Sequence, residues 1–174
     1  WLYDNTFIHN SYIYDLSRQI GRWAPRTRVV ELFDNQNGGK LDYSDYAGVY
    51  VLTEKIKSSP QRIAITGIGP ADVTGDAVSG GYIFKIDRAD GDEVSWLTTN
   101  GVPNQESGQS LVVVEPDPQA DVPAQLTYLQ NHVQAFDSTL FSERAGNFAT
   151  RNYRSFIDTP AWIDHHILNS VAYN

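Results

Sequence analysis

The chain has 174 residues, of which 41% are hydrophobic and 20% charged, a balance typical of one folded globular domain without a membrane-length apolar run. Its formal net charge of −8 argues against nucleic-acid binding through a basic surface, and a bound nucleotide would need a metal ion to offset its phosphate charge. The absence of cysteine excludes disulfides, thiolate metal sites and a cysteine nucleophile.

The first two thirds of the chain predict a short helix followed by antiparallel strands. Apolar residues at spacings of four predict a helix over Ser11–Ile20, which Gly21 ends. The turn-forming sequence Asp34–Gly39 separates two β-rich segments and therefore predicts a hairpin. The strands expected in this part of the chain are Arg28–Phe33, Ala47–Ile56, Tyr82–Asp87, Val94–Leu97 and Leu111–Val114.

The last third is predicted to be helical. Pro123–Phe141 has apolar residues at spacings of three and four, and Asp158-Thr159-Pro160 is a typical helix start. The order of helix, strands and helices predicts an α+β fold, with an antiparallel sheet, a preceding short helix and a C-terminal helical layer. We expect residues 1–174 to be one incomplete domain, with a β-rich part at 26–115 and a helical part at 122–174, because the chain lacks methionine and begins at Trp1.

The predicted strand 47–56 places a carboxylate among large apolar side chains. Alternation puts Tyr50, Leu52, Glu54 and Ile56 on one face, so Glu54 costs free energy there unless it is paired or reaches an edge. Two interpretations stay open: a paired functional carboxylate, or a strand end at which Glu54 emerges into water.

The predicted strand 82–87 contains a lysine between two apolar residues. Lys85 lies on the face opposite Phe84 and Ile86, where it can meet a glutamate or a phosphate. The competing interpretation is an exposed edge strand, on which lysine is a common guard against aggregation.

No metal site and no catalytic residue are predicted within these residues. His165 and His166 follow Asp164, but neighbouring residues of a helix point about 100° apart and do not converge on one metal ion. The acidic turn around Gly91 does not fit the twelve-residue calcium loop, which needs a closing glutamate.

The two strand segments carry a resemblance to a known family. The runs 46–57 (YAGVYVLTEKIK) and 80–88 (GGYIFKIDR) resemble the two most specific blocks of the CotH kinase family, named for a spore-coat protein. The segments 114–118 (VEPDP) and 153–164 (YRSFIDTPAWID) fit the family's spacing, so that the resemblance covers nearly the whole chain.

The resemblance implies a secreted or cell-surface protein of atypical protein-kinase-like fold, which binds ATP with Mg²⁺ or Mn²⁺ and phosphorylates proteins that the sequence does not identify. Kinase chemistry needs positioned cations for the phosphates. As hypotheses, Glu54 with Lys85 or Lys55 forms an ion pair that steadies phosphate contacts, and Tyr50 or Tyr82 offers an aromatic face to adenine.

The chain also departs from the family. The family's Asp- and Trp-rich block, which carries its expected catalytic and metal-binding carboxylates, would follow Asn174, so we expect the chain as given to be inactive alone. The alternative is a non-catalytic surface, adhesion or coat module with the same fold, and a third possibility is a plain structural domain. No partner other than a protein substrate is predicted, and the oligomeric state is not predicted.

Overall fold

The computed structural model describes residues 8–100, 108–117, 122–146 and 152–172. The chain divides into two compact units. The first unit consists of Trp1–Ile56 and Thr159–Asn174, and the second consists of Lys57–Asp158.

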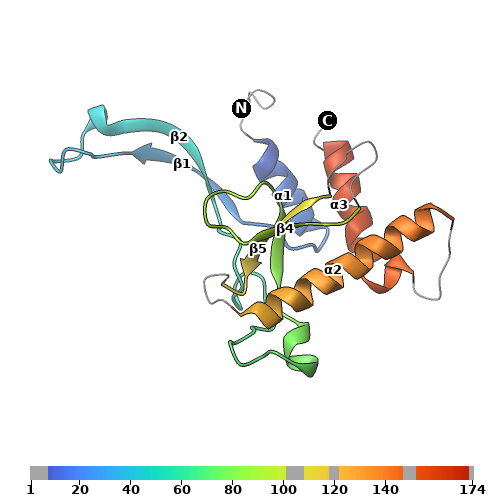
Figure 1. Ribbon diagram of the computed structural model, residues 1–174. Helices are drawn as coiled ribbons and strands as arrows, with labels where there is room; N and C mark the ends of the chain where they lie inside the picture. The colour runs from blue at the N-terminus through green and yellow to red at the C-terminus, as the bar shows by residue number, and fades with distance from the viewer. Residues whose placement is uncertain (1–7, 101–107, 118–121, 147–151, 173–174) are drawn as a thin grey trace. The chain divides into compact units, whose positions relative to one another are not determined.

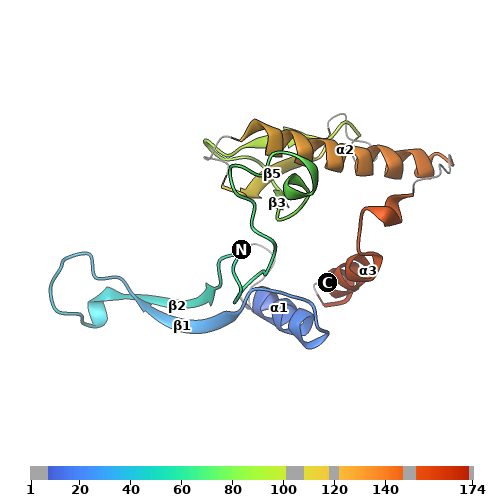
Figure 2. The same cartoon turned by 90° about the horizontal axis from the view of Figure 1, so that it is seen from below.

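The first unit contains a hairpin and two helices, α1 (His9–Gln19) and α3 (Thr159–Ala172). Strands β1 (Thr27–Phe33) and β2 (Tyr46–Thr53) pair antiparallel, as the predicted hairpin requires (Figure 1). Helices α1 and α3 lie side by side (Figure 2) although they come from opposite ends of the chain. An ion pair joins them, because Arg22 Nε, just after α1, lies 2.7 Å from Asp164 Oδ2 on α3.

A network of side chains closes the loop between β1 and β2. Asp42 caps the 3₁₀ turn Tyr43–Asp45 by accepting a hydrogen bond from the Ser44 amide at 2.8 Å. The nearly buried carboxylate of Asp45 accepts from the Asp42 amide and from Asn35 Nδ2, at 3.0 and 3.1 Å. This reciprocal cap fixes the conformation of the loop.

The second unit is built around a three-stranded antiparallel sheet in the order β3-β5-β4. Helix α2 (Pro123–Arg144) packs along it (Figure 2), and the buried cluster Leu111, Val113, Leu129 and Val133 joins the central strand to the helix. The strands are β3 (Ile83–Ile86), β4 (Ser95–Leu97) and β5 (Ser110–Glu115). Among the described residues of this unit, Gly75–Ser79 and Tyr153–Ser155 form short 3₁₀ helices.

The pair Gly80-Gly81 that introduces β3 includes one position at which a side chain is not tolerated. Gly81 has a φ of +81°, which favours glycine, and a Cβ added there would overlap the carbonyl oxygen of Thr66. The backbone of residue 66 therefore approaches β3 as closely as it does because residue 81 has no side chain.

The α+β class, the antiparallel sheets, the preceding short helix and the C-terminal helix are confirmed. The second strand differs from the prediction, because β2 ends at Thr53 and not at Ile56. Its partner strand begins at Thr27, just after Pro25, which has no amide hydrogen for a ladder bond.

The expectation of one domain stays a prediction. None of the described helices is long and apolar enough to span a membrane.

Candidate nucleotide-binding site

Glu54 lies one residue beyond β2 and is held by Arg26, one residue before β1. The guanidinium donates from Nε to Glu54 Oε2 at 3.1 Å and from Nη2 to Oε1 at 2.5 Å, a bidentate pair. The Arg26 amide also donates to Oε2, and the Glu54 amide donates to the Arg26 carbonyl. Hydrogen bonding to Glu54 raises the pKa of Arg26. These bonds show that Glu54 is a paired carboxylate.

The two partners differ in exposure. The Glu54 side chain is only 9% exposed, whereas the Arg26 side chain is 66% exposed. A carboxylate so nearly buried would be costly without its partner. The pair therefore presents a cation, and not an anion, to solvent.

Tyr50 lies on the same face of the hairpin as this pair. The register places Tyr50 opposite Val30 and Leu52 opposite Arg28, and alternation puts these residues on the face that carries Glu54. Tyr50 is 49% exposed, so that its ring remains available to a ligand. Lys55 is also exposed, but alternation places it on the other face.

Lys85 lies on β3, an edge strand of the second unit, and is bound by two carboxylates. Its Nζ lies 2.9 Å from Glu93 Oε1 and 3.4 Å from Asp87 Oδ2. Glu93 is fixed in turn, because its Oε2 accepts from the Asp90 amide at 3.0 Å. The hydrogen bond from Lys85 to Glu93 raises the pKa of the lysine, and the bond from the Asp90 amide lowers the pKa of Glu93.

The surroundings of Lys85 are acidic overall. The stretch from 85 to 93 contains two cations and four carboxylates. An incoming phosphate would therefore be repelled unless a divalent cation accompanied it. The residues concerned are Lys85 and Arg88 on one side and Asp87, Asp90, Asp92 and Glu93 on the other.

Tyr82 precedes β3 and lines a cavity beside α2. Its hydroxyl donates to the Val78 carbonyl at 2.9 Å, and its ring is stacked on Tyr128 with 5.9 Å between centroids. Burial, followed by the neighbouring Tyr128, raises the pKa of Tyr82. One face of the Tyr82 ring is therefore already covered by Tyr128.

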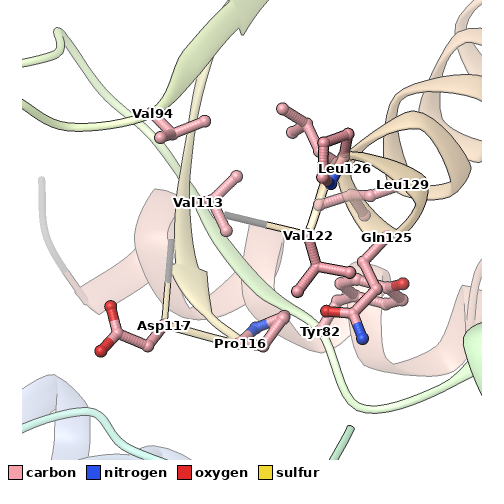
Figure 3. A pocket seen from close by; sticks show the side chains of 10 residues that line it. Tyr82, Val94, Val113, Pro116, Asp117, Val122, Gln125, Leu126 and Leu129 are labelled. Carbon is pink, nitrogen blue, oxygen red and sulfur yellow. The ribbon is translucent and has the colours of Figure 1, made fainter. Parts of the chain in front are cut away.

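The cavity lies between the sheet and the first turns of α2 (Figure 3) and has a volume of about 70 Å³. Gln125, which is 3% exposed, forms part of its wall and donates from Nε2 to the carbonyls of Gly69 and Asp72. Ligand sites for whole cofactors measure roughly 300–1,000 Å³, so this cavity alone does not enclose a nucleotide. Apart from Gln125, Asp117 and the hydroxyl-bearing Tyr82, the residues that line the cavity are apolar.

The structure places the five predicted residues in two groups. Tyr50, Glu54 and Lys55 belong to the first unit, and Tyr82 and Lys85 to the second. Within its own unit, Glu54 is paired with Arg26, and Lys85 with Glu93 and Asp87. An ion pair of Glu54 with Lys85 or Lys55 stays a prediction.

Arg26 and Glu93 were not among the predicted site residues. Each is recognised only through its partner, 28 residues away for Arg26 and eight for Glu93. The sequence signal for Arg26 was the hairpin itself, because a hairpin centred on Asp34–Gly39 brings the segments just outside both strands together.

Within the described ranges, no three His, Asp or Glu side chains gather closely enough to hold a metal ion. Asp164, which precedes His165 and His166, forms an ion pair with Arg22. The ring of His166 lies against Trp162, with 6.2 Å between centroids.

The antiparallel sheets and the helices define an α+β protein consistent with a kinase-like fold. The family model described as CotH kinase protein matches residues 2–174, nearly the whole chain. The chain therefore belongs to the CotH kinase family, and a kinase-type function applies to it in general terms. No curated protein and no solved structure matches the chain.

Proposed function

We propose that this chain is part of a secreted or cell-surface protein kinase, which binds ATP with Mg²⁺ or Mn²⁺ and phosphorylates proteins. Family membership over residues 2–174 supports the general function. The observation that carries the finer statement is the bidentate Arg26–Glu54 pair, on the same face as the half-exposed Tyr50.

Phosphoryl transfer requires few covalent steps from the protein and depends mainly on positioned charges. Cations must bind the phosphates, and a divalent metal must neutralise the charge that develops during transfer. Arg26 and Lys85 are cations whose positions carboxylates fix. With a net charge of −8, the protein needs the metal to bring a polyphosphate close.

Calorimetric titration with ATP in the presence of Mg²⁺ tests the proposal. We expect binding by the unmodified protein, and weaker binding by Glu54→Ala and Lys85→Ala, because each substitution disturbs a positioned ion pair. Glu31→Ala and Lys40→Ala are matched controls, since both residues are exposed and Glu31 lies on the opposite face of β1. Absence of ATP binding, or binding that neither substitution changes, would contradict the proposal.

A non-catalytic surface or coat module with the same fold is the second candidate. It is favoured by apolar side chains on both faces of the hairpin, because Val29 and Val49 on one face and Leu52 on the other are each more than 60% exposed. A protein that binds no nucleotide but associates with other protein chains, measured by light scattering, would support this candidate over the kinase.

A further inference from the structure

The base of the β1–β2 hairpin is positively charged although the chain as a whole is acidic. Arg26 and Arg28 are both exposed and lie two residues apart, so their side chains share a face. Across the ladder, Leu52 and Glu54 are their partners on this face. Two cations therefore stand against one carboxylate, in contrast to the acidic surroundings of Lys85.

Arg26 is held ready for a further anion. Its Nε and Nη2 bind Glu54, while Nη1 donates to no described residue and the side chain is 66% exposed. The planar guanidinium matches the geometry of phosphate oxygens, and a guanidinium already fixed by a carboxylate loses less freedom on binding one. The Arg28 side chain makes no hydrogen bond or ion pair with a described residue. It adds a second cation to this face.

The apolar end of the same face complements a base. Tyr50 precedes Glu54 by four residues, which in a strand corresponds to about 13 Å. That length is comparable to the reach of an extended nucleoside triphosphate from its base to its last phosphate. Val30 and Leu52 lie between the aromatic end and the basic end and provide apolar contacts for the sugar.

We propose that this face of the hairpin binds a nucleoside triphosphate, with Arg26 and Arg28 contacting the phosphates, Glu54 positioning Arg26, and Tyr50 stacking on the base. The proposal rests on the proposed function and identifies the residues that bind its nucleotide. On this hairpin, the proposal assigns the principal phosphate contacts to two arginines and not to Lys55.

Titration calorimetry with MgATP, and separately with adenosine, distinguishes phosphate contacts from other effects. We expect Arg26→Ala and Arg28→Ala each to weaken MgATP binding about tenfold or more, while adenosine affinity changes less than about twofold. Arg88→Ala is the matched control, because it removes the same charge from an exposed turn of the second unit. Glu54→Gln keeps the shape of the side chain and should weaken MgATP binding as Arg26→Ala does.

Arg28→Ala is informative even if Arg26→Ala disturbs the hairpin, because it leaves the Arg26–Glu54 pair intact. If the unmodified protein binds MgATP and both arginine variants bind it like Arg88→Ala, the inference is wrong and the proposed function stands. An equal loss of MgATP and adenosine binding also overturns the inference. If the unmodified protein does not bind MgATP, both proposals are overturned.

Discussion

Lys85 shows how a single residue acquires its environment. The sequence left open whether its ammonium meets a glutamate or a phosphate. The structure places Glu93 on it, because the turn at Asp90–Glu93 folds back and the Asp90 amide fixes the carboxylate. The lysine also lies on an edge strand, as the competing interpretation expected, and its contact with a phosphate stays a prediction.

This cluster should make stability depend on pH at both extremes. The pKa values of Glu93 and Asp87 are lowered from their ordinary 4.5 and 3.8, so their stabilising contribution is present above these values and is lost as the pH falls. The pKa of Lys85 is raised from 10.5, so its contribution is present below that pH and is lost as the pH rises through the raised value.

Urea unfolding between pH 3 and pH 7 checks the acid side. Lys85→Gln should lose less stability on acidification than the unmodified protein, because Glu93 and Asp87 then lack their cation. Lys40→Gln, in the exposed hairpin loop, serves as the control. Identical acid profiles for all three proteins would show that the ion pairs contribute nothing measurable, as is common at exposed sites.

Helix α2 shows what local periodicity leaves undecided at the scale of an element. The apolar residues that recur along it at spacings of three and four include both Leu129 and Leu140. Leu129 is 4% exposed in the core with β5, whereas Leu140 is 44% exposed. Spacing predicts which face of a helix is apolar, but the position of the sheet decides which part of that face is covered.

Truncation of these two leucines should therefore have unequal effects. We expect Leu129→Ala to reduce the free energy of unfolding by about 2–5 kcal/mol, and Leu140→Ala by less than about 1 kcal/mol. Denaturant unfolding followed by circular dichroism measures both losses on the same helix. Equal losses would mean that the two side chains are equally buried, contrary to their exposed fractions of 4% and 44%.

At the scale of the whole molecule, the two units differ in how much apolar surface they bury. Among the described apolar side chains, the buried ones of the first unit are Ile13, Ala24 and Pro25. The second unit buries Val78, Leu111, Val112, Val113, Leu129 and Val133. A two-stranded hairpin with exposed faces has little to stabilise it apart from its own ladder.

Amide hydrogen exchange should reflect this difference. We expect the amides of β1 and β2 to exchange faster than those of β5 and the first half of α2, because local opening costs less where few side chains are buried. Exchange measured by mass spectrometry on peptides from both units provides the comparison. Equal protection of β1 and β5 would show that the hairpin is stabilised by contacts that its own unit does not supply.

The sequence by itself determined the elements, the fold class and the family. Periodicity, turn-forming residues and caps are local features, and they placed the hairpin, the central strand Leu111–Val114 and the two later helices within a few residues of their observed bounds. The two blocks around Glu54 and Lys85 carried the resemblance that the family match over residues 2–174 confirms.

Only the tertiary structure decided which charges meet. Alternation left open whether Glu54 is paired or emerges into water, and it did not identify Arg26, because the register that brings Arg26 to Glu54 depends on how the whole loop from 34 to 45 closes. The partner of Lys85 likewise depends on one turn and its hydrogen bonds. Charge pairing is a property of distances in space, and the sequence specifies those distances only through the complete fold.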